Sequence, residues 1–437
     1  MLMEEQMDRI NFEMCGLLSM AHETENFKPY EEKATAKGNG KMFNLNFNVQ
    51  MLGKDNNING NQQMMRLSTY MPNDVSGKTV YVYINDGYDA KEKKYKGHSE
   101  QIAWGKRNDA SIKKKASEIS KYIVDLEVAS KRKHFRYIEK ALDEGKTPML
   151  NDLKEVGLES AETNAIKEAL EKSNKKRFEF LSEYDFLLFV HKLLTEEKYV
   201  NAFGNKKFNI RGEHTFSYST AKGKWYGNFA PQKIYLQDDD AESFARESVV
   251  LYYGEDSLDD AEGMLEETGK YPVNGWVHVT DDYSRETMFA PYTAIISKTA
   301  TGDTEKDAKA DKIRIARFTV DNEDEIKCMG MTVNLWSGAE RKEITEDDLS
   351  EEQLESILIG DCTLEDIQRE LGGVWGDRVN ENRFCKLMRG FTGGVQDTTF
   401  TREDMNNIAS DDENQFEDVV EESSSSEDEE NLFDGLL

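Results

Sequence analysis

The chain has 437 residues and a formal charge of −29, with 38% hydrophobic and 10% aromatic residues. This length predicts two or three domains, and the apolar content excludes a protein that is disordered throughout. The longest apolar cluster, residues 186–194, is interrupted by His191 and Lys192 and is far shorter than the roughly 20 residues of a membrane span, so we expect a soluble, cytoplasmic protein with no membrane partner.

Alternating residues predict several strands in the first part of the chain. In residues 43–49, Phe, Leu, Phe and Val alternate with three asparagines, which is the period of a half-buried strand. Residues 64–71 follow, and in residues 79–84 three aliphatic residues alternate with Tyr81 and Tyr83. Strands separated by irregular polar loops predict a small antiparallel barrel or sandwich.

A helical region comes next. Residues 152–176 predict a helix, and residues 177–181 predict a short strand. Ser182, followed closely by glutamate, is typical of a helix N-terminus. The apolar positions after it predict a buried helical stripe: Phe186, Leu187, Phe189, Val190, Leu193 and Leu194.

A second β-rich region starts at Phe208, with a hairpin-like turn near residues 220–224. Residues 298–312 are polar and charged and predict a linker or long loop. Residues 313–320 then predict a strand. The remaining predicted elements are a strand at 326–336, two short capped helices at 345–360 and 363–373, and a strand pair at 374–391.

The chain lacks the common catalytic and metal-binding motifs. It contains no phosphate-binding loop, no H-E-x-x-H and no G-x-S-x-G pattern. We therefore expect a protein that is not an enzyme and that uses no cofactor or metal, although a missing motif does not exclude an unrecognised catalytic pocket. The cysteines have no zinc-binding spacing and predict reduced structural thiols: Cys15, Cys328, Cys362 and Cys385.

The β-rich regions instead combine aromatic residues with basic and amide side chains. Single-stranded nucleic acid is held by this combination, because bases stack on aromatic rings, at about 1–3 kcal/mol per base, and cations follow the phosphates. Phe43, Phe47 and Phe229 are expected in the core, whereas Trp104 and Trp225 fit either role. The predicted nucleic-acid-binding residues are Lys41, Arg66, Tyr70, Tyr81, Tyr83, Trp104, Lys222, Lys224, Trp225 and Tyr226.

The charge is unevenly spread along the chain. Residues 1–140 contain 23 basic and 19 acidic side chains, whereas residues 141–402 contain 33 and 52. Residues 403–437 contain 14 acidic side chains and no basic ones. The N-terminal part is therefore the least repulsive to a polyanion, and a nucleic-acid groove there must be locally positive. The alternative is an acidic protein-binding adaptor or DNA mimic that binds no nucleic acid.

The β-rich regions and the acidic C-terminus with its apolar tip, "NLFDGLL", together resemble the single-stranded DNA-binding proteins of bacteria and their phages. The tip departs from the bacterial pattern, in which acidic residues lead into Ile/Leu-Pro-Phe, because it has no proline. The tip also resembles the Leu-Phe peptide that binds a sliding clamp. The resemblance covers roughly the first 240 residues and the tail, and it implies that replication or recombination proteins dock on Leu432, Phe433, Leu436 and Leu437.

These observations predict a mainly β fold with helical insertions (α+β), in which OB-like antiparallel barrels lie in tandem and a disordered acidic tail follows. The expected function is non-catalytic binding of single-stranded DNA during phage DNA replication or recombination. The expected segments are a first OB-like domain with a helical insertion at 1–182, a second OB-like domain at 183–300, a small α+β region at 311–402 that could belong to the second domain, and the tail at 403–437.

Overall fold

The structure of the protein is a computed structural model. It describes residues 9–53, 57–89, 94–258, 260–281, 286–323, 325–342, 349–363, 374–388 and 396–406. The predicted partner-binding residues Leu432, Phe433, Leu436 and Leu437 lie outside the described residues.

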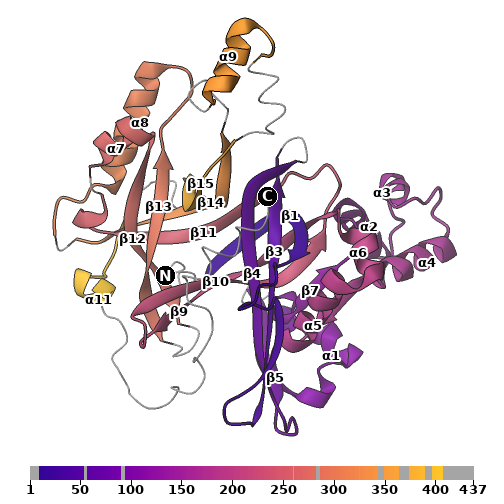
Figure 1. Ribbon diagram of the computed structural model, residues 1–437. Helices are drawn as coiled ribbons and strands as arrows, with labels where there is room; N and C mark the ends of the chain where they lie inside the picture. The colour runs from indigo at the N-terminus through magenta and orange to yellow at the C-terminus, as the bar shows by residue number, and fades with distance from the viewer. Residues whose placement is uncertain are drawn as a thin grey trace.

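Strands make up the centre of the molecule (Figure 1). They are β1 (Ile10–Met20), β2 (Tyr30–Ala34), β3 (Gly40–Leu52), β4 (Ile58–Pro72), β5 (Thr79–Asp89), β6 (Lys94–Ala103), β7 (Tyr122–Asp125), β8 (Arg177–Phe180), β9 (Lys207–Ser219), β10 (Lys224–Leu236), β11 (Phe244–Tyr253), β12 (Lys270–Thr280), β13 (Thr287–Ser297), β14 (Lys327–Lys342), β15 (Val374–Leu387) and β16 (Gln396–Asp397).

Helices lie around this sheet, and within the described residues none is long and apolar enough to cross a membrane. They are α1 (Ala110–Lys115), α2 (Ala129–Asp143), α3 (Leu150–Glu155), α4 (Thr163–Asn174), α5 (Glu183–Thr195), α6 (Glu197–Phe203), α7 (Ala261–Thr268), α8 (Thr304–Phe318), α9 (Glu351–Ile359) and α11 (Arg402–Asn406).

The predicted mainly β fold with helices is confirmed. In the part of the chain that the structure describes, 14 strands belong to one sheet, and β5 and β6 form a separate hairpin. The sheet is mixed, because β10 runs parallel to β4 and β7, and β13 runs parallel to β15. The predicted antiparallel pairing therefore does not hold for these pairs of strands, and the sheet as a whole is not a clear OB barrel.

Two sets of five strands close on themselves within this sheet. In the first ring, β1 pairs with β3, β3 with β4, β4 with β10, β10 with β9, and β9 with β1. In the second ring, β11 pairs with β12, β12 with β13, β13 with β15, β15 with β14, and β14 with β11. Both rings therefore have the same order of strands, with one parallel pair each.

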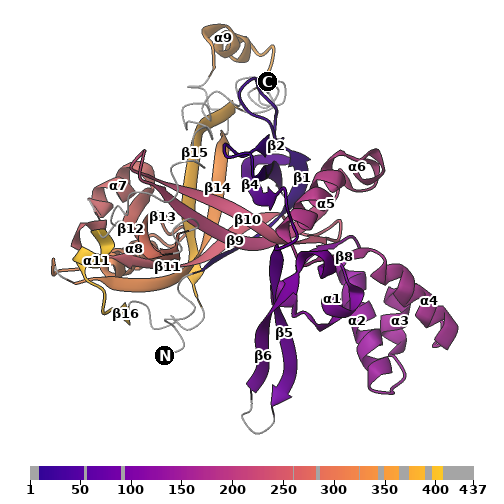
Figure 2. The ribbon, with the colours of Figure 1, turned by 90° about the horizontal axis from the view of Figure 1, so that it is seen from below.

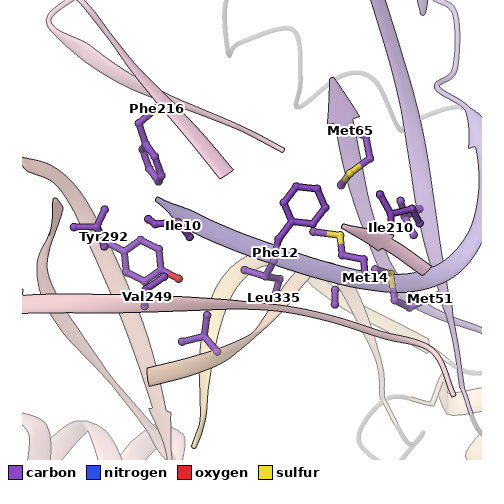
Figure 3. Close-up of a cluster of buried hydrophobic side chains, with 14 of the residues drawn as sticks. Ile10, Phe12, Met14, Met51, Met65, Ile210, Phe216, Val249, Tyr292 and Leu335 are labelled. Carbon is purple, nitrogen blue, oxygen red and sulfur yellow. The ribbon is translucent and has the colours of Figure 1, made fainter. Parts of the chain in front are cut away.

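Strand β1 joins the two rings. Its residues Asn11–Cys15 pair with β9 on one edge and with β11 on the other. Apolar side chains of β1, such as Phe12 and Met14, lie between first-ring and second-ring residues such as Ile210 and Leu335 (Figure 3). One core cluster therefore contains residues of both rings.

The chain between β4 and β9, residues 73–206, is an insert in the first ring. It contains the β5–β6 hairpin, which projects away from the sheet, and the helices α1 to α6 beside it (Figures 1 and 2). The predicted strand and capped helix around Ser182 are confirmed: β8 ends at Phe180, and the Ser182 hydroxyl accepts a hydrogen bond from the Asp185 backbone N–H. The predicted helix at 152–176 is present as α3 and α4, with a break between them.

The predicted linker at 298–312 and the predicted strand at 313–320 are wrong, because residues 304–318 form α8. Asp303 caps this helix by accepting a hydrogen bond from the Lys306 backbone N–H. The buried carboxylates of Asp307 and Asp311 then accept hydrogen bonds from Thr301 and Thr299 in the preceding loop. The alternation of apolar residues that suggested a strand does not reveal these helix-stabilising contacts.

The strand pairing divides the chain differently from the predicted domains. Strands β9 and β10 lie within the predicted domain 183–300, yet they complete the first ring. Strands β14 and β15 lie within the predicted region 311–402, yet they complete the second ring. Within the described residues, β15 is one strand where a pair was predicted. Residues 403–406, assigned to the tail, are helical, and Met405 is buried; the remainder of the tail lies outside the described residues.

Candidate nucleic-acid interface

The β5–β6 hairpin has one buried and one exposed face, as its alternation predicts. Val80, Val82 and Ile84 are buried in a small cluster that closes the base of the hairpin. On the opposite face, Tyr81 is 73% exposed and Tyr83 is 38% exposed. Exposed aromatic rings offer faces on which bases can stack.

The orientation of Tyr83 is fixed by its neighbours. Its backbone N–H donates to the Ser120 hydroxyl (2.7 Å), and its carbonyl accepts from the Ser117 N–H (2.8 Å). Its ring lies over Gly97 of β6, where a methyl group would come within 2.5 Å of the ring. Tyr70 lies over Gly40 in the same way. Each of these two rings therefore occupies the space above a glycine of the neighbouring strand.

Trp104 lies at the base of the hairpin and is only 7% exposed. The Arg107 guanidinium carbon is 3.8 Å and the Lys78 Nζ is 4.8 Å from the centroid of its ring. Arg107 is held by two hydrogen bonds to Asp185, of 2.6 and 3.0 Å. Trp104 is therefore part of the buried cluster and not an open stacking platform. Its ring forms cation–π contacts with Lys78 and Arg107 at the base of the hairpin.

Lysines cluster beside this hairpin. Helix α1 ends in Lys113, Lys114 and Lys115, of which the last two are exposed. Burial lowers the pKa of Lys113, and burial with Arg107 nearby lowers the pKa of Lys78. Residues 78–140, which we call the cationic segment, contain 16 basic and nine acidic side chains, a balance of +7 in a chain of −29. The cationic segment is therefore the part of the chain that repels an anion least.

Two cavities flank the hairpin. One, of about 340 Å³, lies at its base and is lined by Tyr81 and Trp104 among others. The other, of about 960 Å³, lies between the hairpin and α1 and is lined by Lys114, Lys115 and His98. Carboxylates also line the larger cavity, and the hydrogen bond that His98 donates to Asp86 (2.9 Å), together with the charge of Asp86, raises the pKa of His98.

The other predicted residues lie in two places. Arg66 and Tyr70 share a face of β4, as predicted, and Lys78 Nζ donates to the Tyr70 carbonyl (2.7 Å), which ties that strand to the hairpin. Lys41 on β3 forms an ion pair with Glu32. The β9–β10 turn carries a separate group, in which Trp225 is half-buried against Tyr218: Lys222, Lys224, Trp225 and Tyr226.

Sequence reasoning missed Lys78, Arg107, Lys121 and the α1 lysines. The run "SIKKK", which begins two residues after Asp109, indicates this lysine cluster in the sequence, and Asp109 caps α1 by accepting from the Ser111 N–H. Phe43 and Phe47 are buried and Phe229 packs against the core, as expected. Among the described residues, no three His, Cys, Asp or Glu side chains are grouped closely enough to hold a metal ion.

Comparison with known proteins adds no family: neither a protein-family model nor a curated protein matches this chain. Function must therefore be inferred from the geometry and charge of the hairpin surface.

Proposed function

We propose that this protein is a non-catalytic single-stranded DNA-binding protein, phage-encoded and active in DNA replication or recombination. The observation that carries the proposal is the exposed tyrosine pair on the hairpin, set beside the α1 lysines in the one strongly cationic segment of an acidic chain. An unpaired strand is bound by two kinds of interaction, base stacking and neutralisation of its phosphates. Tyr81 and Tyr83 would provide the stacking, and Lys114 and Lys115 would neutralise phosphates.

The strand order supports two OB-type barrels in tandem. In each ring the third and fifth strands are parallel, and a helical segment lies between the third and fourth. OB-folds are five-stranded Greek-key barrels that bind oligonucleotides on the face of their second and third strands and on the loop between strands four and five. In the first ring these positions hold Arg66 and Tyr70 on β4, and Lys222 and Lys224 on the β9–β10 turn.

The C-terminal residues are proposed to recruit replication or recombination proteins, a sliding clamp among the candidates. Leu432, Phe433, Leu436 and Leu437 would be buried by a partner, and the surrounding carboxylates would meet a basic rim. A chain that lacks residues 431–437 is expected to bind DNA at least as tightly as the full chain and to lose the partner in a pull-down. An unchanged pull-down would remove the recruiting role.

A titration of the full chain with labelled oligo-dT at 50 and 200 mM salt tests the central proposal. We expect micromolar or tighter binding at low salt, weakening as salt rises, because phosphate contacts release counterions. No detectable binding at 50 mM salt would reject single-stranded DNA as the ligand. The acidic residues 141–402 would then favour the alternative, an adaptor or DNA mimic that binds basic proteins.

A further inference from the structure

Strand β10 contains a bulge at Gln232. On β9, Pro231 pairs with Gly212 and Lys233 pairs with Arg211, so that Gln232 has no partner residue in this ladder. On its other edge, β10 pairs with β4 at Phe229 and with β7 from Lys233 onward. Gln232 therefore lies where one parallel ladder has ended and the next begins. Bulges re-aim a side chain and are frequent beside functional sites.

The smaller cavity opens at this position. Gln232 lines the cavity of about 340 Å³ at the base of the hairpin, together with the aromatic rings of Tyr81, Trp104 and Tyr184. Tyr184 and Trp104 are neighbours, with ring centroids 6.2 Å apart. Ligand pockets of proteins run from about 300 to 1,000 Å³, so this cavity suits a small, flat ligand.

Three polar side chains of the cavity are available to a ligand. The Gln232 amide and the hydroxyls of Tyr122 and Tyr184 make no side-chain hydrogen bond to any residue that the structure describes. Burial raises the pKa of Tyr122, so that its hydroxyl keeps its proton. None of these three side chains has a fully buried polar atom that lacks a partner, so their polar atoms are accessible to water or to a ligand.

Two lysines and one glutamate line the cavity. Lys78 and Lys121 both line the cavity; Lys121 is paired with Glu179 (2.8 Å). One carboxylate, Glu183, also lines it. The cavity thus combines aromatic walls, an amide that both donates and accepts, and cations beside them.

We propose that this cavity holds one base of the bound strand, turned out of the stack, with its edge hydrogen-bonded to the Gln232 amide. This inference rests on the proposed function, because the base belongs to the strand that Tyr81 and Tyr83 bind. An amide can donate to one atom of a base edge and accept from the next, which is how Asn and Gln distinguish bases. The pocket would therefore give an otherwise sequence-tolerant surface a base preference at one position.

Fluorescence anisotropy with labelled 12-mers of dT, dA and dC, and with an abasic 12-mer, tests this pocket. The full chain is expected to distinguish the three bases by about tenfold. In Gln232→Ala the three affinities should converge to within about twofold, while the abasic 12-mer binds as before. Gln237→Ala, a glutamine just beyond the end of the same strand whose side chain donates to the Tyr235 carbonyl, is the matched control and should keep the preference.

The outcomes separate the pocket from the proposed function. Equal affinity of the full chain for all three bases, or a preference that survives in Gln232→Ala, overturns the pocket and leaves DNA binding in place. Failure to bind any of the oligonucleotides overturns the proposed function and the pocket with it. If Gln232→Ala does not fold, Tyr122→Phe removes a single hydroxyl and should reduce the preference by about threefold; an unchanged preference in that variant overturns the pocket.

Discussion

The two rings share one strand order but differ in what covers them. The first ring carries the insert 73–206 between its third and fourth strands, with two tyrosines exposed beside lysines. The second ring carries α8 at the corresponding position. An aromatic group on the second ring, Tyr252, His278 and Phe289, is in contact with Phe400, a residue that precedes α11. The aromatic group of the second ring is thus covered by Phe400, whereas Tyr81 and Tyr83 on the insert of the first ring are exposed.

Under the proposed function, this difference separates the tasks of the two rings. An open aromatic surface in a positive field can bind a strand, whereas a covered one in an acidic region contributes to stability. In the second ring, Met405 is buried beside Phe400, and Arg402 forms an ion pair with Asp256. The residues that lead into the acidic tail are therefore held against the second ring.

The largest effect is expected from the α1 lysines. Replacing Lys113, Lys114 and Lys115 together by Ala should weaken oligo-dT binding about 100-fold at 50 mM salt and reduce the slope of log affinity against log salt by about 2, since each phosphate contact on a single strand contributes about 0.7. Titrations at four salt concentrations measure both quantities.

The matched control lies on the second ring. Helix α8 also presents exposed lysines, Lys306, Lys309 and Lys312. Replacing these three by Ala changes the net charge by the same amount and should leave both affinity and salt slope nearly unchanged. Equal losses in the two triple variants would mean that net charge, and not the hairpin surface, governs binding.

The second effect is expected from the hairpin tyrosines. Tyr81→Ala with Tyr83→Ala should weaken binding about tenfold or more, because each stacked base contributes about 1–3 kcal/mol. The salt slope should not change, since no cation is removed. Tyr81→Phe with Tyr83→Phe keeps both rings and is expected to keep the affinity. A loss of affinity in the phenylalanine variant would assign the effect to the hydroxyls and argue against stacking.

Part of this surface could be predicted from the sequence. The alternation in residues 79–84 predicts the exposed tyrosines, and Ser182 predicts the start of α5, because both signals are local. The burial of Trp104 was not predictable, since its neighbour Arg107 is held by Asp185, 78 residues further along the chain. Gln232 likewise acquires its setting from a bulge between two parallel ladders, which depends on partners that periodicity does not identify.

A smaller effect is expected on the second ring, at Phe400. This half-buried ring contacts Tyr252, His278 and Phe289, with centroids 5.0 to 5.5 Å apart. Phe400→Ala should lower the free energy of unfolding by about 1–2 kcal/mol, as expected for the loss of a half-buried aromatic side chain, and should leave oligo-dT affinity unchanged. Urea unfolding and anisotropy measure the two quantities. Tighter DNA binding by this variant would show that the covered aromatic group is a second binding surface, and the contrast between the rings would fail.

The smallest effect is expected from pH, through His98 on the hairpin. Hydrogen bonding to Asp86 and its charge raise the pKa of His98 above its ordinary value of 6.5. The protonated ring is therefore favoured in the folded protein, and this contribution is present below pH 6.5 and lost as pH rises through the raised pKa. Deprotonation removes one positive charge from the larger cavity, which Asp86, Lys114 and Lys115 also line, and so makes the cavity less attractive to a phosphate. Oligo-dT should accordingly bind about two- to threefold more weakly at pH 8.5 than at pH 6, a magnitude typical of one exposed ion pair. In His98→Gln the two affinities should be equal, and a pH dependence that persists in this variant would assign it to a group away from the hairpin.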